Sequence, residues 1–112
     1  MDCLFCKIAA GEIPSKKIYE DEDLLAFYDI NPEAPVHFLV IPKKHIASAA
    51  ELRPENSVIV AKIFVVISRI AKELGLSSGY RIVNNCGEDA GQTVQHLHFH
   101  VLAGRSLAWP PG

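Results

Sequence analysis

The sequence predicts an α+β fold in which a short helix, three strands, a long helix and two further strands follow one another along the chain. Three observations support this prediction. One long stretch has apolar residues at helical spacing, shorter apolar runs on both sides have the character of strands, and prolines and glycines separate these segments. With 112 residues, 49% of them apolar, residues 1–112 have the size of a single domain around one core.

The first half of the chain is predicted to hold three of the strands. Its elements are a helix over residues 4–10, strands over residues 17–20, 24–29 and 37–41, and a short helix near residues 46–50. Gly11 ends the first helix, and the charged turn EDED joins the first two strands. Pro32 and Pro35 keep the segment before the third strand out of a helix, and Pro42 ends that strand.

The most regular pattern predicts a long helix from about residue 54 to residue 74. Pro54 suits its first turn, and Gly75 lies just past its end. Apolar side chains recur at helical spacing at Ile59, Ile63, Val66, Ile67, Ile70 and Leu74. The stripe is made wider than one sheet face requires by Val60, Phe64 and Val65. Deep burial in one core would explain this width, but we favour contact with a second copy of the chain.

The last two strands are expected over residues 80–85 and 97–103, with the glycine-bearing loop CGEDAGQTV between them. The run QHLHFHVLAG holds three of the five histidines of the chain, at every second position. Successive side chains of a strand point to opposite faces. One face of the strand is therefore lined by His96, His98 and His100, and the other is buried by Leu97, Phe99 and Val101.

Strand spacing limits what a metal ion could do with these histidines. Alternate residues of a strand lie roughly 6.7 Å apart, so His96 and His100 are separated by about 13 Å. A zinc–nitrogen bond is only about 2 Å long, so one ion cannot bind all three. A solvent-facing amphipathic strand is the purely structural explanation of the pattern. A row of imidazoles that titrate near neutral pH suits nucleophilic attack and proton transfer better.

Charge and hydropathy exclude several classes of partner. The net charge of −2 and a pI near 6.2 offer no broad attraction for nucleic acid. The N-terminal segment is charged and has Asp at position 2, unlike a secretory signal. The longest apolar stretch, residues 58–70, is broken by Lys62 and Arg69 and is too short to span a bilayer. Three cysteines cannot all pair within the chain, so a cytoplasmic location is expected.

Several motifs together resemble one known family. HLHFHVL is similar to the signature of the histidine-triad (HIT) family of nucleotide hydrolases and transferases. Four segments also resemble the Hint branch of that family, the purine nucleoside phosphoramidases: DINPEAPVHFLVIPKKHI, GYRIVNN, AGQTVQHLHFHVL and GRSLAWPPG. The resemblance covers nearly the whole chain. The resemblance implies a HIT-like fold with a five-stranded, mainly antiparallel sheet, one long helix and one or two short ones. It also implies a homodimer with a continuous ten-stranded sheet.

The resemblance assigns catalytic roles to three histidines. The middle histidine of the triad is the nucleophile in this family, and here it is His98. It would attack the α-phosphorus of a purine nucleoside 5′-phosphoramidate, expel the amine and leave a nucleotidyl-histidine that water hydrolyses. His100 matches the histidine that contacts phosphate oxygens and assists proton transfer. His37 resembles a fourth active-site histidine, at the start of a strand that could lie beside the triad.

The resemblance also implies a nucleotide-binding set. The loop before the last strand supplies Gly91, where the backbone can approach phosphate closely, and the hydrogen-bonding side chains of Gln92 and Thr93. Asn85 matches an amide that contacts phosphate, and Asp29 matches the carboxylate that binds the ribose hydroxyls. An apolar slot for the base would be formed by Leu4, Phe5, Ile8, Ile13, Phe27 and Ile30.

The spacing Cys3-x-x-Cys6 is ambiguous by itself, because a redox pair, a metal site and chance all produce it. Bacterial members of the HIT family with such a pair bind zinc through it, together with a histidine after PKK and the first triad histidine. Here those two residues are His45 and His96. Such a filled Cys2His2 set is a structural site, so zinc would stabilise the fold and would not activate water. Cys86 has no motif partner and is expected to be a loop thiol.

The resemblance as a whole predicts a homodimeric, nucleotide-binding hydrolase of purine nucleoside phosphoramidates that needs no cofactor for catalysis. Trp109 and the terminal Pro-Pro-Gly look like the tail that crosses to the partner's active site. Dinucleoside polyphosphates and aminoacyl adenylates are the alternative substrates. A zinc-braced module that binds nucleotides or a protein partner without turnover is the alternative from another class.

Overall fold

The computed structural model describes residues 2–112 and confirms the predicted α+β class. In chain order the elements are α1 (Leu4–Ala9), β1 (Lys17–Glu20), β2 (Leu24–Tyr28), β3 (Val36–Pro42), the 3-10 helix η1 (Ala49–Glu51), α2 (Val58–Glu73), β4 (Arg81–Val83) and β5 (Phe99–Ala103). None of the helices found in residues 2–112 is long and apolar enough to cross a membrane.

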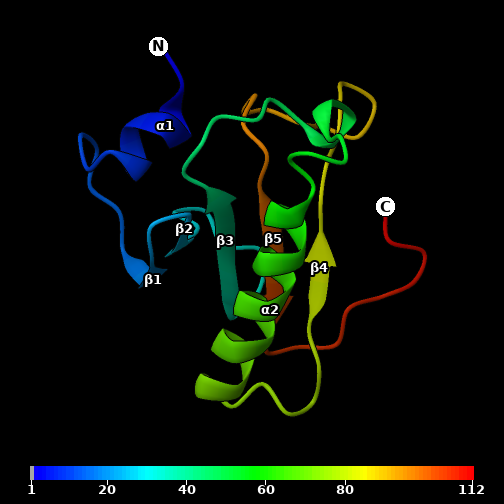
Figure 1. Cartoon of the computed structure of the whole chain (residues 1–112). Coiled ribbons are helices and arrows are strands. Elements are labelled where there is room, and N and C mark those ends of the chain that lie inside the picture. The colour runs from blue at the N-terminus through cyan, green and yellow to red at the C-terminus, as the bar shows by residue number, and fades with distance from the viewer. Residues whose placement is uncertain (1) are drawn as a thin grey trace.

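The strands form one antiparallel sheet with the order β1-β2-β3-β5-β4 (Figure 1). This confirms the predicted five-stranded sheet. β3 lies at the centre, between β2 and β5, although about 60 residues separate β3 from β5 in the sequence. Leu39 of β3 pairs with His100 of β5, and His37 pairs with Leu102. The sheet order therefore brings His37 beside the end of the histidine run.

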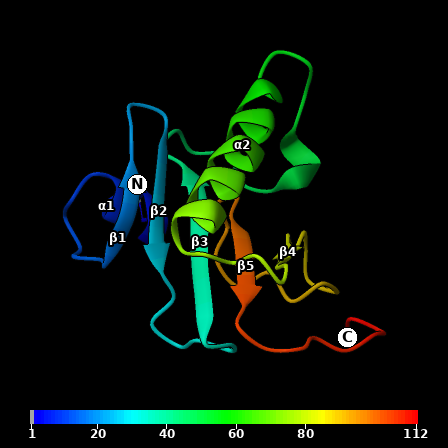
Figure 2. The ribbon, with the colours of Figure 1, turned by 90° about the horizontal axis from the view of Figure 1, so that it is seen from below.

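The two faces of the sheet carry separate apolar clusters. In β2 and β3 the side chains alternate, so that Phe38 and Val40 pack with α2 while Leu39 and Ile41 pack with α1. Figure 2 shows α2 lying across one face and α1 lying behind β1 and β2. The apolar residues that alternate with the histidines, Leu97, Phe99 and Val101, join the cluster under α2. The histidines are left for the α1 side, as the alternation predicts.

Element boundaries differ from the prediction near turns. α2 begins at Val58 instead of residue 54, because Asn56 closes a turn there: its side-chain oxygen accepts a hydrogen bond from the Arg53 amide at 2.7 Å. β5 begins at Phe99 instead of residue 97, because the Leu97 amide leaves the ladder and donates to the Ile46 carbonyl at 2.6 Å. Only His100 of the three triad histidines therefore lies inside a regular strand.

The remaining strand and short helix are also shorter than predicted. β4 covers residues 81–83 where residues 80–85 were predicted, and the short helix is a 3-10 turn over residues 49–51. The outer side of α2 keeps a strip of apolar side chains exposed, at Val58, Phe64 and Val65. Burial of the other side of α2, which includes Ile63, Ile67 and Ile70, agrees with the predicted stripe. The wider stripe thus belongs only partly to the core of one chain.

Candidate functional site

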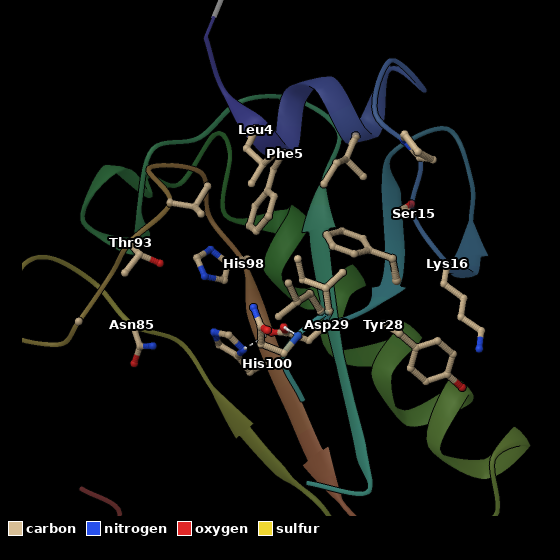
Figure 3. A pocket seen from close by; sticks show the side chains of 18 residues that line it. Leu4, Phe5, Ser15, Lys16, Tyr28, Asp29, Asn85, Thr93, His98 and His100 are labelled. Atoms are coloured by element: carbon tan, nitrogen blue, oxygen red, sulfur yellow. Dashed lines mark hydrogen bonds and ion pairs between the residues drawn. The ribbon is translucent and has the colours of Figure 1, made fainter. Parts of the chain in front are cut away.

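A cavity of about 490 Å³ opens between α1, β2 and the loop that leads into β5 (Figure 3). Most of the predicted nucleotide-binding and catalytic residues line it: Leu4, Phe5, Ile8, Phe27, Asp29, Ile30, Asn85, Gly91, Thr93, His98 and His100. Apolar side chains from α1 and β2 form one end, and the two histidines, Asn85 and Thr93 form the other. The cavity therefore has an apolar half and a hydrogen-bonding half.

His98 is held in one tautomer by a backbone contact. Its Nδ1 lies 2.7 Å from the His96 carbonyl oxygen, which can only accept a hydrogen bond, so Nδ1 carries the hydrogen and donates. The other nitrogen, Nε2, then keeps its lone pair. The ring is buried and makes a T-shaped contact with the Phe5 ring, with the two centroids 5.0 Å apart. A neutral imidazole with a free Nε2 lone pair is a nucleophile.

His37 and His100 form a hydrogen-bonded pair beside the cavity, and the Asp29 carboxylate lies close to both rings. The Glu33 amide donates to His37 Nδ1 at 3.0 Å, so the hydrogen of His37 sits on Nε2. That Nε2 lies 2.9 Å from His100 Nδ1 and 3.4 Å from Asp29 Oδ2. His100 Nδ1 therefore accepts, and the hydrogen of His100 sits on its Nε2. His100 therefore offers its Nε2–H as a hydrogen-bond donor.

The same three side chains could hold a metal ion by proximity alone, since their ligand atoms lie within 4.8 Å of one another. The hydrogen-bond pattern argues otherwise, because the His37 and His100 nitrogens are 2.9 Å apart with one hydrogen between them. Burial, together with the neighbouring His98 and His37, lowers the pKa of His100 to about 4. His100 is therefore a neutral hydrogen-bond donor at pH 7.

The loop between β4 and β5 lines the polar half of the cavity. Gly91 has a φ of +81°, a conformation that glycine adopts without strain. Thr93 and Asn85 contribute a hydroxyl and an amide. Gln92 needs a correction, because its buried side chain donates to the Ala47 and Val94 carbonyls and accepts from the Gly87 amide. Its amide group builds the loop and has no hydrogen left for a phosphate.

Asp29 places one carboxylate oxygen in a turn and the other near the histidines. Oδ1 accepts a hydrogen bond from the Asn31 amide at 2.8 Å, and Oδ2 faces His37. Besides Gln92 and His37, two further predicted residues do not line the cavity. Ile13 packs partly buried against the α1 cluster, and Trp109 is 81% exposed in the C-terminal segment.

Several residues of the site were not predicted. Ser15, Lys16 and Tyr28 also line the cavity, and the buried Ser15 hydroxyl has no hydrogen-bond partner within residues 2–112. The Asn84 side chain donates to the His98 carbonyl at 2.9 Å. Asn84 follows Val83, the last residue of β4 that pairs with β5. The NN pair and the segment IPSKK have turn-like composition, which does not distinguish a site from an ordinary loop.

The second cluster joins four sulfur and nitrogen ligand atoms from Cys3, Cys6, His45 and His96, all within 4.8 Å of one another. Cys3 Sγ and Cys6 Sγ lie 3.3 and 3.5 Å from His96 Nδ1. His45 Nδ1 lies 3.3 Å from both Cys6 Sγ and His96 Nδ1. Metal bonds of about 2.3 Å to sulfur and 2.0–2.1 Å to nitrogen in a tetrahedron give edges of about 3.5 Å for S–N and 3.3 Å for N–N. The observed distances fit a tetrahedral ion.

The surroundings of His96 also fit a metal ligand. Its Nε2 donates to the Pro42 carbonyl at 2.8 Å, which leaves the Nδ1 lone pair facing the cluster. The ring is fully buried, and this burial lowers the pKa of His96, which favours the neutral form that binds metals. No disulfide joins cysteines within residues 2–112, so none competes for the sulfur atoms.

The fold and the two sites define a small α+β protein that places a buried imidazole in a half-apolar cavity, next to a Cys2His2 cluster. Comparison with known proteins identifies the class. The model of the HIT domain family matches residues 10–107. The chain belongs to the HIT family.

Three solved structures illustrate the similarity. A histidine triad protein from Clostridium difficile is 57% identical, with a TM-score of 0.94 and 96% of this chain and 95% of that one covered. A HIT family hydrolase from Legionella pneumophila is 49% identical, with a TM-score of 0.97 and 99% and 100% covered. A histidine triad nucleotide-binding protein from Candida albicans is 35% identical, with a TM-score of 0.82 and 97% and 83% covered.

Proposed function

We propose that the protein hydrolyses purine nucleoside 5′-phosphoramidates through a nucleotidyl intermediate on His98. The observation behind this proposal is the pairing of a His98 Nε2 lone pair with a neutral His100 donor at the polar end of a cavity whose other end is apolar. The names of two similar proteins, a hydrolase and a nucleotide-binding protein, support the same class of activity.

The cavity suits the three parts of a nucleotide. A purine base would lie in the apolar half, between side chains of α1 and β2 that include Phe5 and Phe27. The Asp29 carboxylate, whose Oδ2 faces His37, would accept hydrogen bonds from ribose hydroxyls. The Thr93 hydroxyl and the Asn85 amide would donate to phosphoryl oxygens, so that no basic patch is needed.

Catalysis would proceed in two displacements at phosphorus. His98 Nε2 forms a bond to the α-phosphorus while the phosphorus–nitrogen bond breaks, and the amine leaves with a proton from solvent. The His96 carbonyl stabilises the positive charge on the phosphorylated ring, since His98 Nδ1–H donates to it. Water then attacks phosphorus, and the nucleoside monophosphate leaves as His98 is regenerated. The His100 Nε2–H stabilises charge on a phosphoryl oxygen in both steps.

We infer that the Cys2His2 cluster holds a structural zinc ion. Four protein ligands fill a tetrahedral zinc site, so the ion would brace the fold and leave the chemistry to His98. Metal analysis of protein purified from zinc-supplemented cells should find one zinc per chain. Less than stoichiometric zinc under those conditions would contradict the assignment.

We further propose a homodimer that joins two sheets into one of ten strands. β4 is an edge strand, and the exposed strip Val58, Phe64 and Val65 of α2 gives a second copy an apolar surface. The exposed Trp109 would then reach the partner's cavity. A reducing cytoplasm, which keeps the cysteines reduced, suits this protein.

Mass spectrometry under denaturing conditions tests the catalytic proposal directly. Brief mixing with adenosine 5′-phosphoramidate should add one adenylyl group to the wild-type chain and none to His98→Ala. Hydrolysis that survives in His98→Ala would refute the assigned nucleophile. Parallel assays with a diadenosine polyphosphate and an aminoacyl adenylate compare the leaving groups, and cleavage of these in preference to the phosphoramidate would refute the proposed substrate class.

A further inference from the structure

α1 contributes to both sites at once. Leu4, Phe5 and Ile8 line the cavity, while Cys3 and Cys6 supply two of the four atoms of the metal cluster. Ligand residues and cavity residues therefore interleave within six consecutive positions. Any shift of this segment relative to the sheet would change the cluster and the apolar wall together.

Phe5 touches a side chain of each site. Its ring makes T-shaped contacts with His98, with centroids 5.0 Å apart, and with His96, with centroids 6.0 Å apart. It also meets Phe27 of the apolar wall at 5.7 Å. Phe5 is 6% exposed, so this packing is close and has little room to rearrange.

His96 provides a second connection between the sites. Its Nδ1 faces the cluster, and its own carbonyl oxygen accepts the hydrogen bond from His98 Nδ1 at 2.7 Å. The residue that would bind the metal is thus the one that sets the tautomer of the proposed nucleophile.

α1 is too short to be stable by itself. A helix of six residues gains few hydrogen bonds for the cost of nucleation, so it depends on its contacts with the rest of the fold. Its N-cap is unusual, since Cys3 Sγ accepts the hydrogen bond from the Cys6 amide at 3.3 Å. The same sulfur atom belongs to the metal cluster. The helix start and the metal site therefore share one atom.

We propose that metal binding and nucleotide binding are coupled, with α1 as the coupling element. The metal holds α1 against the sheet and so completes the apolar wall, and a bound base holds α1 in the position that the metal requires. This inference rests on the proposed function for its nucleotide part. Linkage requires that the two effects be equal: the factor by which zinc tightens nucleotide binding is the factor by which nucleotide tightens zinc binding.

The first experiment measures hydrogen exchange in zinc-loaded and chelator-stripped protein. We expect the amides of α1 to lose protection on stripping while those of β2 and β3 keep theirs. Unchanged protection in α1 would overturn the inference whatever the protein binds. Because this readout uses no nucleotide, it separates the inference from the proposed function.

The second experiment measures AMP affinity by calorimetry with and without zinc, and zinc affinity by chelator competition with and without AMP. We expect each ligand to raise the binding affinity of the other by about tenfold or more, by the same factor in both directions. Equal AMP affinity in both forms would overturn the coupling. Failure of the zinc-loaded protein to bind AMP at all would refute the proposed function and with it the nucleotide half of the inference, whereas the α1 exchange result would still decide the metal half.

Two variants sharpen the second experiment. Phe5→Leu keeps an apolar side chain but loses the ring contacts, so AMP should tighten zinc binding clearly less than in the wild type. Lys7→Ala changes an α1 residue that belongs to neither site, and its coupling should equal that of the wild type. If stripped protein unfolds throughout, the comparison of wild type with Phe5→Leu still decides, because global unfolding would couple the two ligands equally in both proteins. Equal coupling in wild type and Phe5→Leu would overturn the role given to Phe5.

Discussion

The buried histidines differ in which nitrogen each one leaves available. His96 donates from Nε2 to the Pro42 carbonyl and presents Nδ1, whereas His98 donates from Nδ1 to the His96 carbonyl and presents Nε2. His37 accepts from the Glu33 amide and orients His100. Backbone groups therefore set three of these tautomers, and the fourth follows from its neighbour. Backbone N–H and C=O groups do not titrate, so they keep these tautomers fixed when the pH changes.

Replacement of His37 tests the orienting role. His37→Phe removes the hydrogen bond to His100 Nδ1, so His100 can place its hydrogen on the wrong nitrogen. We expect kcat for adenosine phosphoramidate to fall roughly 10- to 100-fold, the usual size for a lost orienting partner, with KM little changed. Steady-state kinetics check this. His37→Gln, whose amide can still donate, should lose less, and a larger effect on KM than on kcat would contradict the prediction.

Acid stability should depend on His100. The pKa of His100 is about 4 in the folded state against an ordinary value of 6.5, so between these pH values the unfolded chain binds more protons. The contribution of His100 to the free energy of unfolding is therefore fully present above pH 6.5 and is lost as the pH falls to about 4. As the pH is lowered through this range, the urea concentration at the midpoint of unfolding should fall more steeply for wild type than for His100→Asn. Parallel slopes for the two proteins would show that His100 titrates normally.

At the scale of elements, the site depends on where strands end. β5 begins only at Phe99, so His98 lies just before the strand, where the Asn84 side chain donates a hydrogen bond to its carbonyl. The turn after β5 is equally constrained. Gly104 has a φ of +92°, and Arg105 beyond it donates to the Glu33 carbonyl, which lies close to His37 in the chain.

Gly104→Ala tests this turn. A Cβ at Gly104 would lie 2.8 Å from Pro35 Cβ, and the positive φ adds strain. We expect a loss of roughly 2 kcal/mol or more in the free energy of unfolding, measured by urea denaturation. Gly75→Ala is the matched control, because Gly75 also has a positive φ of +70° but meets no atom within 4 Å. A control as destabilised as Gly104→Ala would show that backbone strain alone accounts for the loss.

At the scale of the whole molecule, one chain leaves apolar surface on the outer side of α2. Val65 is 68% exposed, whereas its near neighbour Ile67 is fully buried. An exposed apolar strip and an edge strand are each typical of a contact with another chain. The proposed dimer is the arrangement that would cover both.

Sedimentation of Val65→Glu tests the dimer. A charge in the centre of an apolar interface is costly, so we expect wild type to sediment as a dimer and the variant as a monomer at the same micromolar concentration. Glu12→Gln, a charge change on the opposite side of the sheet near α1, should remain a dimer. A wild-type monomer, or a dimeric Val65→Glu, would show that this strip is not the interface.

Local patterns in the sequence sufficed for much of the fold. Helical spacing located α2, prolines and glycines located the turns, and alternation assigned Leu97, Phe99 and Val101 to one face. The first turn of α2 and the start of β5 could not be predicted, because they depend on hydrogen bonds from the Asn56 side chain and to the Ile46 carbonyl. Such bonds are set by the neighbouring loop and leave no periodic signal.

The sequence by itself determined the residue types of both sites: a histidine run with an apolar reverse side, a CxxC pair and the motifs of the HIT family. Only the tertiary structure decided their distances. Cys3 meets His96 across 93 residues, and His37 meets His100 across 63, because the sheet order places β3 next to β5 and α1 over the same face. It also turned Gln92 away from the cavity and Ser15 towards it. Side chains so far apart in the chain become neighbours through packing, which no local pattern encodes.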